Sequence, residues 1–154
     1  HSDTIAVKRD DEVIGCLRLI RCQAGCLVDG ARFSGERFSL PTKFPGSSEF
    51  ISPEQSVEAS RWIGQAVDLS DGRKLLVSML ALEAGLAHAM NLGMKYWIWA
   101  LKDKSYFHLL RDGWELREFI PGAHTYHGST VRICGARVAS WPCRKFIESS
   151  NDVL

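Results

Sequence analysis

The alternation of apolar and polar positions predicts a hairpin at the start of the chain. Two β-rich stretches, 4–8 and 13–20, flank a polar turn at 9–12. The apolar positions of 13–20 are almost continuous, which indicates that both faces of this strand are covered. Arg18 interrupts this apolar run, so we expect it to have a polar partner.

The next segment, 24–53, shows neither a helical nor a strand period. It is rich in glycine and proline, and a stretch of this length without regular structure is typical of a lid or a binding loop. It also contains four phenylalanines, which predict that the segment folds onto an apolar surface.

The centre of the chain predicts a strand, a long helix and a second strand. The strand 55–63 is followed by a helix over 73–92, which is apolar almost all round and therefore buried. Ser70 or Asp71 is the expected helix cap, and Gly93 is placed to end the helix. In the second strand, 95–101, the period of two puts Trp97 and Trp99 on one face.

The remaining pattern predicts a short helix over 103–110, capped by Asp103, and a closing hairpin of 114–120 with 129–139. The turns of this hairpin are expected at Pro121–Gly122 and His127–Gly128, and the tail after Ser140 is expected to be partly helical or frayed. The long helix between two strands implies a parallel crossover, whereas the hairpins imply antiparallel pairs. We therefore predict an α/β (α+β) fold with a mixed sheet and helices packed on it.

Composition adds limits to this picture. The chain has 154 residues, enough for one domain, and 45% of them are hydrophobic. A net charge of +1 provides no field for nucleic acid or an anionic membrane, and no signal peptide or membrane-length apolar run is present. We therefore expect a cytoplasmic protein without a membrane span or a nucleic-acid partner.

The cysteines predict neither a metal site nor disulfides. No C-x-x-C pair occurs, so the usual zinc spacing is missing, and free thiols in a reducing compartment are expected. The five cysteines are Cys16, Cys22, Cys26, Cys134 and Cys143.

The order of elements from 55 onward resembles the second half of the GNAT acyltransferase fold. That resemblance implies a sheet that splays open between 55–63 and 95–101, with the thioester arm of the donor in the opening. The glycine-rich loop that holds the pyrophosphate of coenzyme A in that family is not matched by 65–73. Because Asp68 and Asp71 would repel a pyrophosphate, we expect a phosphopantetheine arm on an acyl carrier protein as the donor.

Three motifs resemble the acyl-homoserine-lactone synthases within that fold. They are a G-x-x-R strand at Gly15–Arg18, a phenylalanine at Phe44, and an E-x-S-R-F strand at Glu58–Trp62, where tryptophan replaces the phenylalanine. A segment L-x-x-x-G-W at 109–114 is also similar, and the resemblance covers roughly 4–140. The spacing of Phe44 matches the family only approximately.

The family's N-terminal segment is not matched. It supplies an arginine, aromatic residues and two aspartates near the amine substrate, whereas here only Asp3 lies in that region. The chain also starts at His1, so we expect a beginning that is missing or altered, or an incomplete acceptor site. The expected divisions of the single domain 1–154 are the hairpin 1–23, the lid 24–53, the thioester half 54–140 and the tail 141–154.

The resemblance places the chemistry at Glu58 and Ser60. Amide formation needs a base for the amine, and Glu58 is the only acid within this strand. A purely structural ion pair of Glu58 with Arg18 or Arg61 is the alternative. Strict alternation puts Glu58 and Ser60 on one face and Arg61 on the other, so all three meet one site only if a β-bulge intervenes. Both arginines are candidates for holding Glu58 or a substrate carboxylate.

Further candidates bind the donor. Gly64 permits close approach of the arm, and backbone N–H groups at 62–64 are candidates for an oxyanion hole. Trp62, Trp97, Trp99 and Phe107 are candidates for an acyl pocket, with core packing as the alternative. Tyr106 is a weaker candidate for the general acid, and His88 is expected to be a core histidine. A basic patch for the carrier protein would comprise Arg73, Lys74 and Arg111, with Arg144 and Lys145 as further members.

Three functions remain open on this basis. The first is an acyl-homoserine-lactone synthase that uses S-adenosylmethionine and an acyl thioester as substrates, with a transient acyl carrier protein partner and no tightly bound cofactor or metal. The second is an N-acyl amino acid synthase with a free amino acid as acceptor. The third is a non-catalytic module that binds an acyl group or a carrier protein.

Overall fold

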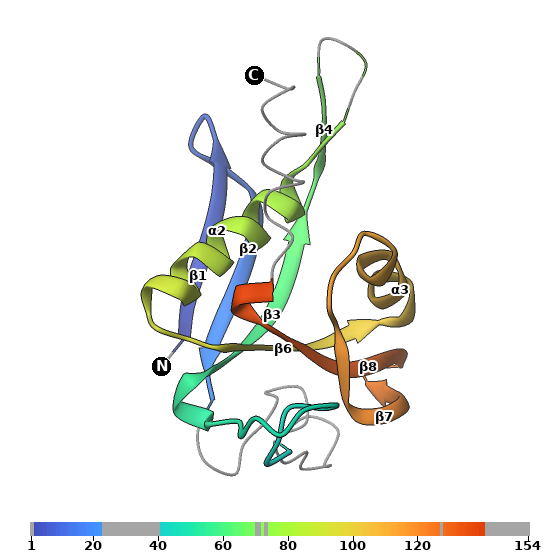
Figure 1. Ribbon diagram of the computed structural model, residues 1–154. Helices are drawn as coiled ribbons and strands as arrows, with labels where there is room; N and C mark the ends of the chain where they lie inside the picture. Colours follow the sequence, from blue (N-terminus) through green and yellow to red (C-terminus); the bar gives the residue numbers. More distant parts are fainter. Residues whose placement is uncertain (1, 23–40, 70–71, 73, 127, 141–154) are drawn as a thin grey trace.

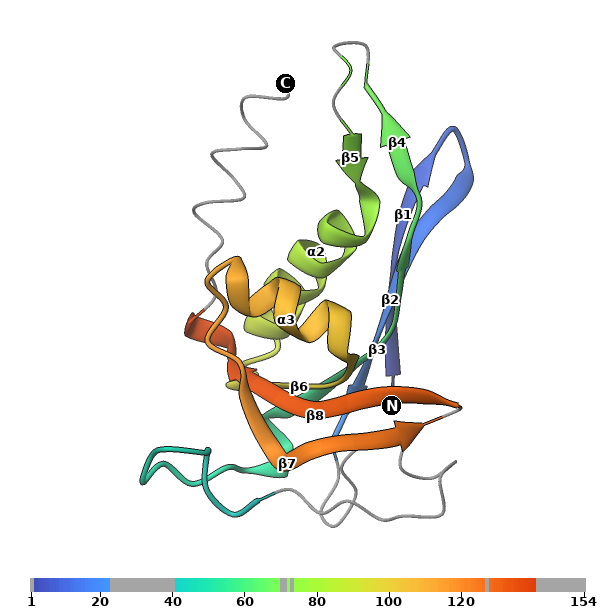
Figure 2. The same cartoon turned by 90° about the vertical axis from the view of Figure 1, so that its right-hand side faces the viewer.

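A twisted six-stranded mixed sheet forms the centre of the molecule, with both long helices on one of its faces (Figures 1 and 2). The computed structural model describes residues 2–22, 41–69, 72, 74–126 and 128–140. The strand order is β1-β2-β3-β6-β8-β7, and β4 and β5 form a separate two-stranded ribbon. The strands are β1 (Ser2–Arg9), β2 (Glu12–Arg21), β3 (Ser56–Gly64), β4 (Ala66–Asp68), β5 (Lys74–Leu76), β6 (Tyr96–Lys102), β7 (Arg117–Tyr126) and β8 (Ser129–Arg137). The helices are η1 (Pro53–Gln55), α2 (Val77–Asn91), α3 (Asp103–Arg111) and η2 (Val138–Ser140).

The predicted N-terminal hairpin is confirmed. Strands β1 and β2 pair antiparallel, and the two residues between them, Asp10 and Asp11, have φ angles of 49° and 67°. Two consecutive left-handed residues are the geometry of a type I′ turn, whose twist matches that of the strands, and aspartate tolerates it better than most residues.

The predicted splaying of the sheet is also confirmed. Strands β3 and β6 run parallel, and their register extends only from Ser56 opposite Tyr96 to Ala59 opposite Trp99. Beyond these pairs β3 continues to Gly64 and β6 to Lys102 without pairing to each other. Figure 1 shows the two strands leaving each other at this point. We call it the divergence of β3 and β6.

The start of the long helix was predicted wrongly. Helix α2 begins at Val77 rather than at 73, and Leu76 occupies the cap position in place of Ser70 or Asp71. The reason is the β4–β5 ribbon, which turns back through Gly72 at a φ of 81° and takes up the residues before the helix. The end was predicted correctly, since α2 finishes at Asn91 and Gly93 adopts a left-handed φ of 73°.

The last third of the chain contains two further corrections. Asp103 is the first residue of α3 rather than its cap, and its carboxylate accepts a hydrogen bond of 2.8 Å from Arg132 Nε. Pro121 and Gly122 do not form a turn, because β7 runs through them and absorbs them in a shift of register between Ile120 and His124. Strand β7 is the edge of the sheet, where proline is tolerated.

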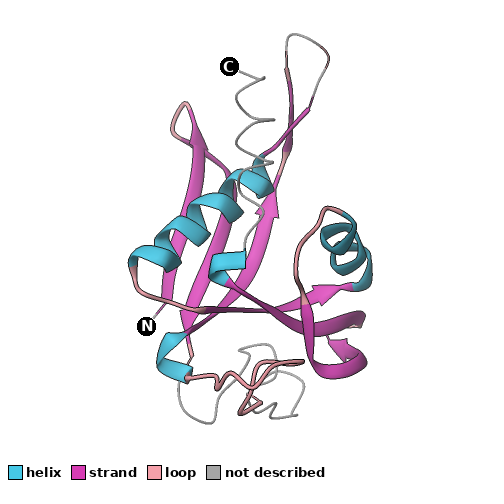
Figure 3. Cartoon of the chain, viewed as in Figure 1, coloured by secondary structure: helices cyan, strands magenta, loops and turns pink. Residues whose placement is uncertain are grey.

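The two faces of the sheet have different coverings, as the cartoon coloured by secondary structure shows (Figure 3). On the helix face, α2 and α3 pack on an apolar core drawn from all the central strands, including Leu17, Val57, Trp97 and Trp99. On the opposite face, which we call the loop face, the segment 42–51 brings Phe44 and Ile51 against a smaller cluster comprising Tyr96, Ile98, Phe119 and Ile133. Within the described residues, no helix combines the length and apolar character needed to cross a membrane.

Candidate active site

A β-bulge in β3 decides which side chains lie on each face at the divergence. Arg18 of β2 is opposite Ser60 of β3, but Cys16 is opposite Ile63, so β3 has one residue more than β2 between these pairs. Arg61 and Trp62 therefore both stand opposite Leu17, and Arg61 adopts a left-handed φ of 51°. This is the bulge that a shared site was expected to require.

The bulge reverses the alternation of side chains along the strand. Before it, Glu58 and Ser60 point to the loop face, because they pair with Ile20 and Arg18 of β2 and Glu58 also pairs with Ile98 of β6. After it, Trp62 lies on the helix face, where it packs against the main core. Arg61 itself is exposed, whereas Glu58 is buried.

On the loop face, three candidate residues come together at the divergence. Glu58 is 4% exposed, and it is one residue away from the last β3–β6 pair. Arg18 Nε donates a hydrogen bond of 3.0 Å to Ser60 Oγ, which supplies the polar partner expected for this arginine. A buried carboxylate next to a point where two strands part is suited to take a proton from a nucleophile that approaches between them.

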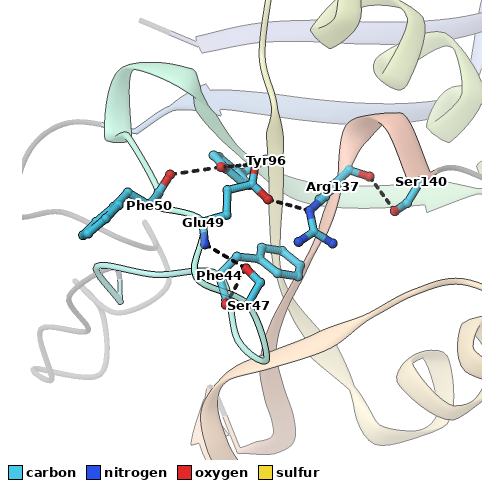
Figure 4. A network of polar contacts seen from close by, with 7 residues as sticks. All are labelled: Phe44, Ser47, Glu49, Phe50, Tyr96, Arg137 and Ser140. Carbon is cyan, nitrogen blue, oxygen red and sulfur yellow. Dashed lines mark hydrogen bonds and ion pairs between the residues drawn. The ribbon is translucent and has the colours of Figure 1, made fainter.

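A polar network that sequence reasoning missed holds the loop 42–51 against this face (Figure 4). The carboxylate of Glu49 accepts hydrogen bonds of 2.7 Å from the Tyr96 hydroxyl and 2.7 Å from Arg137 Nε. The Tyr96 hydroxyl is also 3.0 Å from the Phe50 carbonyl oxygen, and the Arg137 guanidinium lies 4.4 Å from the centre of the Phe44 ring. We call Glu49, Tyr96 and Arg137 the loop clamp.

The clamp changes the acidity of its members. The hydrogen bond from Tyr96, followed by that from Arg137, lowers the pKa of Glu49. Burial, with the hydrogen bond and charge of Glu49, raises the pKa of Tyr96 to about 12. The only signal in the sequence was the turn dipeptide Pro45–Gly46, which marks the small hairpin that carries Glu49; the partners are too distant in sequence for a pattern to link them.

On the helix face, tryptophans gather at the divergence. The rings of Trp62 and Trp99 are stacked with centroids 6.3 Å apart, and Trp99 also contacts Trp97 at 5.4 Å and Trp114 at 5.6 Å. Trp62 Nε1 donates a hydrogen bond of 2.6 Å to the Ser78 carbonyl oxygen in the first turn of α2. Trp97 and Trp99 are at most 1% exposed, so both contribute to the core.

Other candidates lie away from this centre or have a structural contact of their own. A Cβ atom on Gly64 would be 2.2 Å from Ser78 N, so this glycine admits the close approach of α2 to β3. Phe107 is 53% exposed on α3, and its ring lies 5.0 Å from the Arg132 guanidinium. Tyr106 is buried beside it, and burial raises the pKa of its hydroxyl. A role in catalysis or binding stays a prediction for each of them.

The expected basic patch is not formed by the described side chains. Lys74 lies on β5 and contacts Asp68 at 3.7 Å, whereas Arg111 ends α3 and contacts Asp112 at 3.8 Å. Each therefore has an acidic partner on its own element or ribbon, and Figure 1 shows α3 and the β4–β5 ribbon apart. Arg73, Arg144 and Lys145 lie outside the described residues, as do Cys26 and Cys143.

The structure also bears on the predictions for His88 and for the cysteines. His88 is not a core residue, because it is partly exposed on α2 and its Nε2 lies 3.0 Å from the Asp3 carboxylate of β1. Among the described cysteines, Cys16 and Cys134 are free thiols, and burial raises the pKa of Cys134. Among the described residues, no group of three or more histidine, cysteine or acidic side chains is placed to hold a metal ion.

The architecture of this chain recurs in solved structures of acyltransferases. It matches MesI, described as a CoA-dependent acyl-homoserine lactone synthase, with a TM-score of 0.59 and 17% identity over 90% of this chain. The AHL synthase LasI matches with a TM-score of 0.58 and 14% identity over 86% of this chain. The chain has the fold of the acyl-homoserine-lactone synthases.

The same fold also belongs to an enzyme of the alternative class. FeeM, an N-acyl amino acid synthase from uncultured soil microbes, matches with a TM-score of 0.58 and 10% identity over 92% of this chain. The chain spans 63% of the length of MesI, 62% of LasI and 75% of FeeM. No protein-family model matches the sequence, and no curated protein matches it significantly. These likenesses establish the acyltransferase fold, and the splayed sheet is the part of it that the sequence predicted.

Proposed function

We propose that this protein is an N-acyltransferase that forms an amide from an acyl thioester and the amine of S-adenosylmethionine, giving an acyl-homoserine lactone. The observation that carries the proposal is the position of Glu58, which is buried on the loop face one residue before β3 and β6 part. The acyltransferase fold supports the reaction class, and the E-x-S-R strand supports the synthase over other members of the fold.

In the proposed reaction, the donor's thioester lies between the unpaired ends of β3 and β6, and the amine approaches from the loop face. Glu58 takes a proton from the amine, directly or through a water molecule, and the amine nitrogen attacks the thioester carbonyl carbon. Backbone N–H groups of β3 beyond the bulge would stabilise the oxyanion, since among the described residues this stretch is not paired with β6. The C–S bond then breaks, and the thiolate leaves and is protonated.

Formation of the lactone is a second, intramolecular step. The carboxylate of the acylated S-adenosylmethionine attacks the carbon bonded to the sulfonium, the C–S bond breaks, and methylthioadenosine leaves as a neutral thioether. Arg18 stands beside Ser60 on the loop face, and we propose that it orients the acceptor's carboxylate or Glu58. Ser60 holds Arg18 in this role.

The donor is proposed to be an acyl carrier protein. The β4–β5 ribbon stands at the sequence position before α2 where the GNAT family has its glycine-rich loop, and the exposed Asp68 carboxylate on this ribbon would disfavour a pyrophosphate. Two solved structures of the same fold, MesI and BjaI, are described as CoA-dependent. Equal kcat/KM values for acyl-CoA and acyl carrier protein donors would therefore remove this part of the proposal and leave the amide chemistry intact.

The N-acyl amino acid synthase is the second candidate, favoured by the likeness to FeeM. Mass spectrometry of organic extracts from cells that express the full-length protein separates the two candidates. Acyl-homoserine lactones support the first candidate, and acyl amino acids replace it with the second. If the protein retains acyl carrier protein without forming either product, the non-catalytic module is correct.

The role of Glu58 is tested by Glu58→Gln, which keeps the shape of the side chain and removes the base. We expect kcat to fall by roughly 10²–10⁴-fold. The matched control is Glu115→Gln, an exposed glutamate on the segment before β7, which is expected to keep full activity. If Glu58→Gln folds normally and remains as active as the control, Glu58 is not the base.

A further inference from the structure

Two tryptophans bridge the divergence of β3 and β6 on the helix face. Trp99 is the β6 residue of the last β3–β6 pair, and Trp62 follows the bulge on β3. Their rings are stacked at 6.3 Å with an interplanar angle of 29°. The two strands have already parted in the backbone, but on this face their side chains still touch.

Contacts with other residues fix both rings of this pair in place. The indole N–H of Trp62 donates a hydrogen bond of 2.6 Å to the Ser78 carbonyl oxygen at the start of α2. Trp99 is 1% exposed and packs between Trp97 and Trp114, with ring centroids 5.4 Å and 5.6 Å away. A side chain that is tied to a helix terminus and one that is locked in the core do not swing aside without a cost in packing.

The chemistry of the site decides which part of the donor meets this pair. Because Glu58 faces the loop side, the polar amine acceptor occupies that side of the thioester carbonyl. The acyl group extends away from the carbonyl, and its apolar carbons are favoured on the opposite, helix side, where the main core lies. An acyl chain on that path meets the stacked pair of Trp62 and Trp99.

We propose that Trp62 and Trp99 act as a stop that limits the acyl group of the donor to short chains. This inference rests on the proposed acyltransferase function and adds the substrate class of its donor. Trp62 is the specificity-determining member of the pair, because it is only partly buried and can be replaced at a smaller loss of core packing than Trp99.

The test compares thioesters of butanoate, octanoate and dodecanoate, each supplied on acyl carrier protein and on coenzyme A, with S-adenosylmethionine or free amino acids as acceptor. For the full-length protein, kcat/KM is expected to fall by at least about tenfold from butanoyl to octanoyl. In Trp62→Ala, the ratio of octanoyl to butanoyl kcat/KM is expected to rise by at least about tenfold, since space opens where the indole stood.

Two further variants keep the test decisive. Trp62→Phe keeps an aromatic ring but loses the hydrogen bond to Ser78. We therefore expect it to raise the ratio of octanoyl to butanoyl kcat/KM by a smaller factor than Trp62→Ala. If Trp62→Ala does not fold, Trp62→Phe is the variant that tests the stop. Met90→Ala, at an exposed position of α2, is the control, with an unchanged ratio expected.

The results distinguish this inference from the function on which it rests. If the protein uses octanoyl as well as butanoyl donors, or if folded Trp62 variants keep the original ratio, the stop is refuted and the acyltransferase stands. If the protein neither turns over nor retains any thioester, the proposed function is refuted, and the inference is refuted with it.

Discussion

The two faces of the sheet at β3 differ in the kind of side chain that they carry, although residues of the same strand contribute to both. The helix face is an apolar core in which Val57, Trp97 and Trp99 are at most 1% exposed. The loop face combines a smaller apolar cluster with buried and half-buried polar groups, among them Glu58, Arg18 and the loop clamp. Free energy of folding comes mainly from the first face, and the proposed chemistry lies on the second.

The bulge at Arg61 is what lets one strand serve both faces. Without the bulge, strict alternation would put Trp62 on the loop face beside Ser60. Arg61 would then lie on the helix face, next to Trp99. With the bulge, Glu58 and Ser60 keep the loop face and Trp62 joins the core. An irregular backbone position therefore separates Glu58, the proposed base, from the apolar core within a few residues.

The largest difference between the faces is expected in stability. Trp97→Ala removes a fully buried ring that packs against Gly85 of α2, and we expect the free energy of unfolding to fall by about 3–5 kcal/mol. Phe44→Ala on the loop face should cost less, toward the lower end of this range, because the small hairpin 42–51 can settle into the space. Urea unfolding measures both. Equal losses for the two variants would contradict the division into a core face and a site face.

The junction between β3 and α2 should show the next largest effect. Gly64→Ala places a methyl group 2.2 Å from the backbone nitrogen of Ser78, so α2 or the end of β3 must move. We expect a loss of about 1–3 kcal/mol in urea unfolding. The neighbouring exposed Gln65→Ala is the control and should change stability little. A Gly64→Ala protein as stable as the control would show that the helix does not press on the strand here.

The loop clamp should contribute a smaller, pH-dependent term. Because the pKa of Tyr96 is about 12 in the folded protein and near its usual value of 10 when unfolded, the phenol keeps its proton longer in the folded state. Its contribution is therefore complete below pH 10 and is lost as the pH rises from 10 to 12. Tyr96→Phe should cost about 1 kcal/mol at neutral pH.

Melting temperatures between pH 8 and 11 measure this effect. The Tyr96→Phe protein is expected to lose less stability over this range than the unaltered protein. Tyr106 also has a raised pKa, so both proteins retain some alkaline loss, and the difference between them reports Tyr96. Parallel curves would mean that the pKa of Tyr96 is not raised in the folded protein.

A substitution within the bulge should give the smallest change in the free energy of unfolding, and this change should not be a loss. Arg61→Gly replaces a residue with a left-handed φ of 51° by the residue that adopts this conformation freely. Since the left-handed conformation costs an ordinary residue about 1–2 kcal/mol, we expect no loss or a gain of up to about 1 kcal/mol. The control, Arg117→Gly in the extended edge strand β7, should lose about 0.5–1 kcal/mol. Equal losses would place Arg61 in a regular strand.

Patterns that depend on near neighbours were predicted well. The hairpin of β1 and β2, the strands β3 and β6 and the C-terminal end of α2 all follow from local periodicity and from turn residues. Predictions failed where residues distant in sequence compete for the same segment. The ribbon of β4 and β5 took up the first residues of the expected helix, and pairing with β8 carried β7 through Pro121.

The sequence alone determined the order of the six strands of the main sheet and of the two α-helices, because periodicity is a local property. The resemblance of this order to the GNAT fold predicted that β3 and β6 part, and the short E-x-S-R motif made Glu58 the candidate base. The sequence also called for a partner for Arg18 without identifying Ser60. Tertiary structure decided the rest: the bulge that turns Trp62 to the core, the stack with Trp99, and the clamp that joins Glu49 to Tyr96 and Arg137. These contacts join residues tens of positions apart, and their geometry depends on how the twisted sheet and its coverings pack together.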